Sequence, residues 1–248
     1  MNRGATDLTG VRHKSYETLG STNAEALALA RAGERGPLWI TSKTQSAGRG
    51  RRDNAWVSEP GNLFATILLK APSLPAQAPQ LSFVAALAVH DAVAACAPQI
   101  GPALSVKWPN DLLFGGKKLA GILIEGDSEK VFAVAVGIGV NCVSHPLQTV
   151  HPATDLKAAG TAVDSDQLFA ALARAMDKRL SQWQGGRDFA SIRADWLKRA
   201  AGLGEPIRVR LPERELIGRF EGLDDAGRLL LKGEDGVTTV SAGEVFGL

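Results

Sequence analysis

Five apolar, β-rich runs dominate the first 140 residues, and short polar loops separate them more often than helices do. Gly115-Gly116 lies between two of the runs and is typical of a hairpin turn. One helical pattern, at residues 80–97, falls among them, with apolar residues at helical spacing. Runs of strands with few helices between them favour an α+β fold with a mixed or largely antiparallel sheet. The five runs span residues 37–42, 62–70, 106–114, 117–125 and 131–140.

The pattern changes after residue 201. Two amphipathic helices, expected at 166–183 and 189–201, are followed by a Gly/Pro-containing segment, 202–206, that is typical of a linker. Beyond it, four short strand-like runs alternate with Asp- and Gly-containing turns, which predicts a small β-barrel of roughly forty-five residues. We therefore expect two domains, residues 1–201 and residues 202–248.

Composition limits the partners of this chain. Of its 248 residues, 45% are hydrophobic and 22% charged, as in an ordinary globular enzyme. The formal net charge of +2 does not indicate general affinity for nucleic acid. The polar N-terminus has no signal-peptide pattern, and no apolar run is expected to span a membrane. Cys96 and Cys142 lie in apolar surroundings, which favours buried free thiols over a disulfide or a catalytic thiol. A soluble, cytoplasmic protein is expected.

The loop from Lys43 to Trp56 alternates arginine with glycine after a buried strand. Glycine lets the backbone approach a ligand, and successive N–H groups then cradle an anion. Arginine adds a planar fork of donors for carboxylate or phosphate, and Gln45 can both donate and accept. Trp56 could close over a ring. The loop therefore suits a small polar anion. A solvated basic surface loop is the alternative, and the loop alone does not decide between them.

Two further stretches carry polar residues at places where ligands bind. Thr22 and Glu25 have capping-box spacing before a helix expected at 24–32, so the hydroxyls of Ser21 and Thr22 lie at a helix N-terminus. They either bind a polar ligand or only cap the helix. Lys118 lies on an apolar strand, three residues before Gly121. It is either functional or an edge-strand lysine that extends to solvent. The segment 144–159 has no periodicity and is expected to be a loop.

Several familiar motifs are absent from the sequence. No G-x-x-x-x-G-K-[ST], G-x-S-x-G, H-E-x-x-H or C-x-x-C occurs, and no G-x-G run completes a dinucleotide fingerprint. The four histidines offer little for a zinc site or a histidine-centred triad. The chain offers instead a nucleotide or carboxylate site made of arginine, lysine and amides.

Five separate blocks of the chain form one ordered set. They are Ser21-Thr22-Asn23, Gln45 to Arg52 with Trp56, Lys107 to Asp111, Lys118 to Leu123, and Gly137 to Asn141. Taken together and in this order, the blocks resemble the biotin protein ligase family. The resemblance covers nearly the whole chain, includes an SH3-like C-terminal domain, and favours the binding interpretation for the arginine loop, for Ser21-Thr22 and for Lys118. It implies a class II synthetase-like catalytic domain with a mixed, largely antiparallel sheet.

The sequence departs from the family pattern at two places. Asp53 and Asn54 stand where the loop usually continues as glycine and a basic residue, which bears on how the loop closes. About twenty residues precede Ser21, too few for the winged helix-turn-helix of larger members. The resemblance is therefore to the monofunctional ligase.

The resemblance implies a biotin–[biotin carboxyl carrier protein] ligase that uses ATP with Mg²⁺. Biotin would become biotinyl-5′-AMP and then pass to a lysine of a carrier domain of a biotin-dependent carboxylase. Catalytic roles fall on Arg51, Lys118 and Asp111, and no dedicated metal site is implied. Biotin-binding roles fall on Ser21, Thr22, Asn23, Gln45, Gly48, Arg49, Gly50, Arg51, Lys118 and Gly121. Nucleotide-binding roles fall on Arg51, Arg52, Trp56, Lys107, Asn110 and Asn141.

Other functions remain as alternatives. A lipoate or octanoyl ligase or transferase shares the fold superfamily but uses an R-R-x-S-G-G-G-A loop, which is absent here. A non-catalytic regulator that binds biotinyl-AMP is disfavoured because Lys107, Asp111 and Lys118 are all present. No DNA or membrane partner is expected, and the sequence leaves open whether the chain forms a homodimer.

Overall fold

The computed structural model describes residues 10–52, 54–128 and 132–247. Asp53, one of the two departures from the family's loop, lies outside the described residues, as does Val131, the expected start of one strand.

Seven strands form a mixed sheet in the order β1-β2-β3-β7-β6-β5-β4. The first two strands of that order run parallel, and every other neighbouring pair is antiparallel. The predicted α+β class with a largely antiparallel sheet is therefore confirmed. The strands are β1 (Arg12–Leu19), β2 (Leu38–Gln45), β3 (Leu63–Lys70), β4 (Leu104–Lys107), β5 (Asp111–Phe114), β6 (Lys117–Asp127) and β7 (Ala133–Val140).

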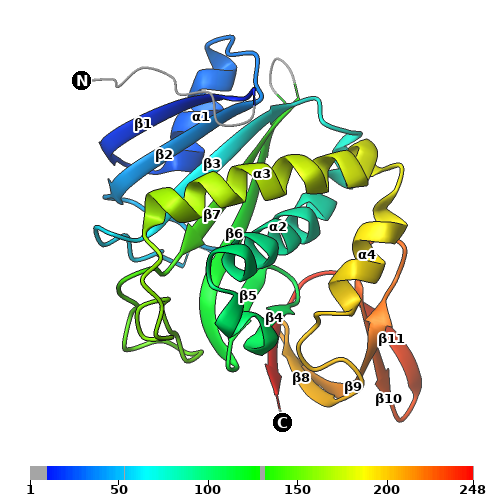
Figure 1. Ribbon diagram of the computed structural model, residues 1–248. Helices are drawn as coiled ribbons and strands as arrows, with labels where there is room; N and C mark the ends of the chain where they lie inside the picture. Colours follow the sequence, from blue (N-terminus) through cyan, green and yellow to red (C-terminus); the bar gives the residue numbers. More distant parts are fainter. Residues whose placement is uncertain (1–9, 53, 129–131, 248) are drawn as a thin grey trace.

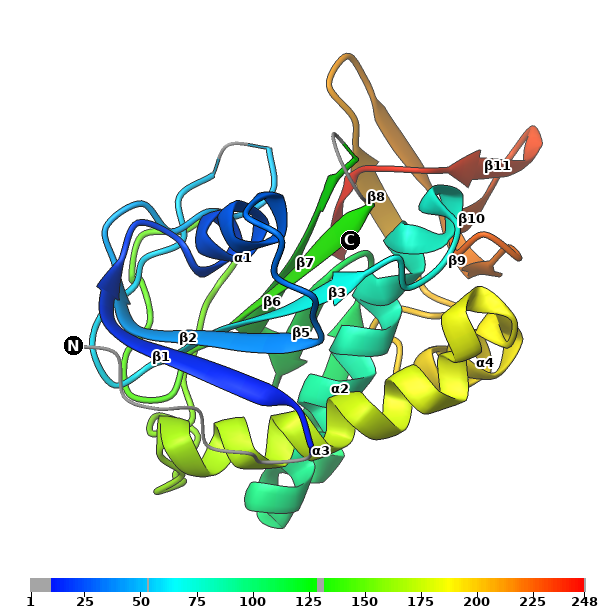
Figure 2. The same ribbon diagram turned by 90° about the horizontal axis from the view of Figure 1, so that it is seen from above.

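Helices cover both faces of this sheet. α2 (Leu81–Cys96) and α3 (Ser165–Trp183) lie on one face, and α1 (Thr22–Arg31) lies on the other (Figures 1 and 2). Successive side chains of a strand point to opposite faces, so β2 serves both layers. Trp39 joins the large core beneath α2 and α3, whereas Leu38 and Ile40 join the smaller core beneath α1.

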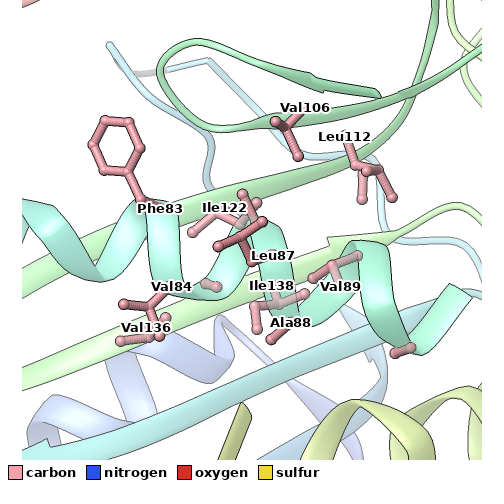
Figure 3. Close-up of a cluster of buried hydrophobic side chains, with 14 of the residues drawn as sticks. Phe83, Val84, Leu87, Ala88, Val89, Val106, Leu112, Ile122, Val136 and Ile138 are labelled. Carbon is pink, nitrogen blue, oxygen red and sulfur yellow. The ribbon is translucent and has the colours of Figure 1, made fainter. Parts of the chain in front are cut away.

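α2 is the central helix of the large core. By length and composition the 22-residue stretch Pro75–Cys96 is long and apolar enough to cross a membrane, so the expectation that no run qualifies is wrong. In this fold, 67% of its apolar window is buried. Val84 and Leu87 lie beside Val136 and Ile138 of β7 (Figure 3). Such burial is typical of the core helix of a globular protein, which satisfies the same criteria as a membrane span.

α1 begins earlier than the capping-box spacing predicts. Ser21 is the N-cap, and its hydroxyl accepts a hydrogen bond from the backbone N–H of Ala24 at 3.4 Å. The predicted pairing of Thr22 with Glu25 is wrong because both side chains are used elsewhere. Thr22 turns toward Gln45, and Glu25 accepts a hydrogen bond from the Tyr16 hydroxyl at 2.9 Å.

The C-terminal residues form a second, wholly antiparallel sheet in the order β11-β10-β9-β8-β12. Four of its strands were expected, but β12 was not; it exists because it pairs with β8. The preceding helix α4 (Phe189–Leu197) ends at Leu197 rather than at the expected Ala201. The indole N–H of Trp108 donates to the carbonyl of Gly227 at 3.1 Å and so ties the two parts together. The strands are β8 (Pro206–Arg210), β9 (Glu215–Leu223), β10 (Leu229–Gly233), β11 (Gly236–Val240) and β12 (Glu244–Gly247).

Both cysteines are free thiols, as expected. Cys142 is buried, and this burial raises the pKa of its thiol to about 12, so the thiol stays protonated and unreactive. Cys96 is only half-buried, contrary to the expectation that both are buried.

Candidate active site

One cavity brings together nearly all of the sequence-predicted site residues, from the N-terminus of α1, the end of β2, the arginine loop and strands β4 to β6. Gly48 and Asn141 are the predicted residues that do not line it. The predicted residues that do are Ser21, Thr22, Asn23, Gln45, Arg49, Gly50, Arg51, Arg52, Trp56, Lys107, Asn110, Asp111, Lys118 and Gly121.

One end of the cavity is neutral and is built from hydrogen-bonding side chains. The backbone N–H of Thr22 donates to Gln45 Oε1 at 2.8 Å, which fixes the orientation of that amide. Gln45 Nε2 then donates to Ser58 Oγ at 3.0 Å, and Ser58 donates to the carbonyl of Trp56 at 3.0 Å. The helix N-terminus and the arginine loop are therefore joined through Gln45.

Asn23 links the same helix to strand β6. Its Nδ2 donates to Glu125 Oε2 at 2.8 Å, and its Oδ1 lies 2.7 Å from the hydroxyl of Thr66. The Glu125 carboxylate also accepts a hydrogen bond from Arg49 Nη2 at 2.9 Å. Sequence reasoning missed Thr66 and Glu125. The one available signal was a polar side chain in, or at the end of, an apolar strand.

The other end of the cavity is cationic. Its lining includes the positive side chains of Arg51, Arg52, Lys107 and Lys118, against the carboxylates of Asp111 and Glu244, so the cations outnumber the carboxylates. Arg49 also lines the cavity, but it is paired with Glu125 beside Asn23. An excess of arginine and lysine in a partly enclosed space suits a phosphate or carboxylate ligand.

Arg51 is held inside this cationic end. Its Nη1 donates to Asn110 Oδ1 at 3.2 Å. Burial lowers the pKa of Arg51, and the neighbouring charge of Arg52 lowers it further. Burial also lowers the pKa of Lys107. Because desolvation and like charge both disfavour these cations, a bound anion would relieve the penalty.

Lys118 and Asp111 form an ion pair within the cavity, with Nζ and Oδ1 2.8 Å apart. The ion pair lies next to Trp56, whose ring centroid is 5.4 Å from Lys118 Nζ. The Trp56 indole rests on a floor made by Gly121 and Gly139, which face each other in the register of β6 and β7. A Cβ atom at Gly139 would lie 2.5 Å from Trp56 Cε2. These glycines therefore make room for the indole.

The C-terminal sheet contributes to the cavity as well. His151 Nδ1 lies 3.4 Å from Lys107 Nζ, and its Nε2 lies 2.8 Å from Glu244 Oε1 of β12. Burial lowers the pKa of His151, and the Lys107 charge lowers it further, against the opposing effect of Glu244. Neither His151 nor Glu244 was predicted. Their position depends on contacts between distant segments, for which the sequence holds no local signal.

Gly48 and Asn141 lie outside the cavity lining, and their contacts hold neighbouring segments in place. Gly48 has no room for a side chain, since a Cβ atom there would lie 2.5 Å from the Trp56 carbonyl oxygen. Asn141 is buried, and its amide donates to the carbonyl of Thr154 at 2.9 Å. The side chain of Asn141 therefore holds the 144–159 loop, and its role in nucleotide binding stays a prediction.

Comparison with known proteins gives the family. The chain matches the Biotin/lipoate A/B protein ligase family over residues 21–141 and the Biotin protein ligase C terminal domain over residues 202–247. It is 46% identical over 238 residues to the biotin--[acetyl-CoA-carboxylase] ligase of Paracoccus denitrificans, covering 91% of this chain and 96% of the relative. It is 34% identical over 234 residues to the ligase of the same name from Mycobacterium tuberculosis, covering 92% of this chain and 86% of the relative.

A solved structure agrees with these matches. The biotin protein ligase from Aquifex aeolicus in complex with biotin and ATP superimposes with a TM-score of 0.80 at 25% identity, covering 94% of this chain and 97% of that one. The expected ligase fold with an SH3-like C-terminal domain is therefore confirmed. Both sequence and fold place the chain in the biotin protein ligase family.

Proposed function

We propose that this chain is an ATP-dependent biotin protein ligase. It forms biotinyl-5′-AMP from biotin and ATP and transfers the biotinyl group to a lysine of a biotin carboxyl carrier domain. Relatives that share 46% and 34% of their aligned residues with it are biotin--[acetyl-CoA-carboxylase] ligases. The proposed acceptor is therefore the carrier domain of acetyl-CoA carboxylase.

The observation that carries this proposal is the chemical difference between the two ends of one cavity. Biotin has a neutral cyclic urea at one end and a carboxylate at the other, and ATP adds a polyanion. Thr22 and Gln45 offer neutral hydrogen-bonding groups for the urea, while Arg51 and Lys118 offer positive charge where carboxylate and phosphate meet. Asn23 and Ser21 complete the neutral end, and Gly121 lies in the cavity lining beneath the Trp56 indole.

In the first step, a carboxylate oxygen of biotin attacks the α-phosphorus of ATP. A new P–O bond forms, the bond to the β-phosphate breaks, and pyrophosphate leaves. The step brings anions together, so the protein acts mainly through positioning and charge stabilisation. We assign that work to Arg51 and Lys118, with backbone N–H groups of the Gly48-Arg49-Gly50 segment against the carboxylate.

In the second step, the ε-amine of the carrier lysine attacks the acyl carbon of the adenylate. A C–N bond forms, the bond from the acyl carbon to AMP breaks, and the amine loses a proton. Asp111 is the carboxylate closest to this chemistry, since it is paired with Lys118 at 2.8 Å. We assign it the role of holding, or accepting the proton from, the incoming amine.

The nucleotide is assigned to the side of the cavity lined by Arg52, Trp56, Lys107 and Asn110. Among the described residues no cluster of histidine, cysteine or carboxylate side chains could hold a metal by itself. We propose that Mg²⁺ would accompany ATP and neutralise its phosphates. In this arrangement residues 1–201 form the catalytic domain. Residues 202–248 form the C-terminal domain, which adds Glu244 to the nucleotide side.

The test is an assay of pyrophosphate release from ATP with biotin or with lipoate as the acid. Streptavidin blotting of a purified carrier domain then reports the transfer. A ligase of biotin releases pyrophosphate with biotin and labels the carrier. Release with lipoate alone would favour the lipoate or octanoyl alternative, and biotinyl-AMP binding without release or labelling would favour a regulator.

A further inference from the structure

Thr66 is a fully buried polar residue on the inner strand β3, and it does not line the cavity. Its hydroxyl has two short contacts, 2.8 Å to Thr22 Oγ1 and 2.7 Å to Asn23 Oδ1. A hydroxyl carries one proton, so it can donate to one of these oxygens and must accept from the other. The direction of these two hydrogen bonds decides whether the Thr22 hydroxyl offers the ligand a proton or a lone pair.

The orientation of the Asn23 amide settles this question. Its Nδ2 lies 2.8 Å from a carboxylate oxygen of Glu125 and 3.2 Å from the carbonyl of Leu123. Ionised carboxylates and carbonyls only accept, so the NH₂ group must be on that side. Asn23 Oδ1 then faces Thr66 and cannot donate. The Thr66 proton therefore goes to Asn23.

With that proton committed, the contact between Thr22 and Thr66 must use the proton of Thr22. The competing contact of Thr22 Oγ1, to Gln45 Oε1, is longer at 3.2 Å. Gln45 Oε1 also already accepts the backbone N–H of Thr22 at 2.8 Å. Thr22 is left with lone pairs, and no proton, for the cavity that it lines.

We propose that Thr66 is a positioning residue that sets the hydrogen-bond polarity of Thr22, so that the cavity offers an acceptor to a ring N–H of the biotin urea. The polarity originates at Glu125 and passes through Asn23 and Thr66. This inference rests on the proposed function, because it assigns the urea to the neutral end. It makes Thr66 a determinant of specificity that never touches the ligand.

The position of Gly137 on β7 shows that this chain of contacts is held in place. A Cβ atom there would lie 2.9 Å from both Cγ and Nδ2 of Asn23. The Asn23 amide is therefore packed directly against the strand. Gly137→Ala would displace the amide and break the same chain of hydrogen bonds without altering Thr66, which supplies a second, independent perturbation.

The experiment measures the binding of three ligands to the full chain by calorimetry. The ligands are biotin and its two cyclic carbamate analogues, in each of which an oxygen replaces one ring N–H. In the wild type, the analogue that places its oxygen against Thr22 is expected to bind at least about tenfold more weakly than biotin, because two acceptors then face each other. In Thr66→Val the Thr22 hydroxyl can turn and donate, so this preference for biotin should fall by about fivefold or more.

Three variants complete the design. Thr66→Ser keeps the hydroxyl and should retain the wild-type preference. Gly137→Ala should lose the preference as Thr66→Val does, and it replaces that variant if Thr66→Val does not fold. Thr41→Val removes a hydroxyl from the neighbouring strand, where it contacts His13 Nε2 at 2.8 Å, and should leave the preference unchanged.

The readout separates polarity from simple structural support. If Thr66→Val or Gly137→Ala weakens biotin and both analogues by the same factor, Thr66 only supports the site and the inference is overturned. Unchanged affinities in both variants would overturn it as well. A wild-type chain that binds no biotin and releases no pyrophosphate would contradict the proposed function itself.

Discussion

The contact between Gly139 and Trp56 allows a sharp test of the cavity floor. Gly139 lies in the extended strand β7, so its backbone needs no special conformation. A Cβ atom there would lie 2.5 Å from Trp56 Cε2 and 2.6 Å from Nε1. Gly139→Ala is therefore a purely steric perturbation of the indole.

The size of the effect follows from the contact distances and from the mobility of Trp56. Carbon atoms pack at about 3.5–4.0 Å, so the indole must retreat by about 1 Å. If it could not move, overpacking would cost about 1–3 kcal/mol of stability. Trp56 is only half-buried and lies on a loop, so it can move. We expect less than about 1 kcal/mol of lost stability but at least tenfold lower kcat/KM, since a displacement of about 1 Å near the reacting groups can cost about 100-fold.

The assay is pyrophosphate release with biotin and ATP varied in turn, together with thermal unfolding. Gly126→Ala on the neighbouring strand β6 is the matched control. A Cβ atom there meets only the Ala133 carbonyl and Phe132, both at an ordinary 3.8 Å. Wild-type kinetics are expected for Gly126→Ala.

A double variant checks that Trp56 transmits the effect. Once Trp56→Ala has removed the indole, adding Gly139→Ala should cause little further loss of kcat/KM, because contacting residues are not additive. Equal kinetic constants for wild type and Gly139→Ala would refute the reasoning. So would full additivity of the two substitutions.

Three further outcomes are expected. Lys118→Ala should slow pyrophosphate release at least about tenfold while biotin affinity stays within about tenfold, because the Lys118 charge acts mainly in the transition state. Lys117→Ala, at an exposed neighbouring residue, is the control. Unchanged pyrophosphate release in Lys118→Ala would contradict the assignment. Arg51→Gly should release biotinyl-AMP about ten- to a hundredfold faster, since a charge-assisted contact contributes about 1.5–3 kcal/mol. Streptavidin labelling of an unrelated lysine-rich protein reports the released biotinyl-AMP. If that protein stays unlabelled while free adenylate is present, Arg51 does not retain the adenylate. Burial raises the pKa of Asp195, but hydrogen bonds from Gln182, Arg179 and Lys198 outweigh it and lower the pKa from 3.8 to about 2. This carboxylate therefore stabilises the fold above its unfolded-state pKa, and the contribution is lost as the pH falls toward 2. In denaturant titrations the stability gap between wild type and Asp195→Asn should shrink between pH 3.8 and about 2, and a constant gap would exclude this linkage.

Much of the fold could be predicted from periodicity, because alternation and helical spacing report burial directly. Prediction fails where pairing between strands, rather than the local sequence pattern, determines where a strand lies and ends. β2 was expected to end at Ser42 but continues to Gln45, because parallel pairing with β1 extends to Leu19. The residues added are polar, so their own pattern gives no strand signal. β12 likewise depends on β8, more than thirty residues earlier in the chain.

The candidate site divides in the same way. The residues that form recognisable blocks could be found from the sequence, and most of them line one cavity. The residues that orient them could not be found in this way, because the role of each depends on a contact with a partner that is distant in the sequence. Glu125 lies 102 positions from Asn23, and Glu244 lies 93 positions from His151. The glycines of β6 and β7 could be noticed as a pattern, but only the Trp56 indole explains two of them.

The two ends of the cavity are built differently, and this matters for a reaction in two steps. The neutral end rests on buried contacts such as that between Thr66 and Thr22. At the cationic end, His151 and Glu244 form a contact that is only partly buried, with side chains 22% and 34% exposed. A contact between partly exposed charged groups contributes only about 0–1 kcal/mol, so little free energy opposes its opening. We therefore expect the cationic end to open more readily than the neutral end when pyrophosphate leaves and the carrier lysine enters.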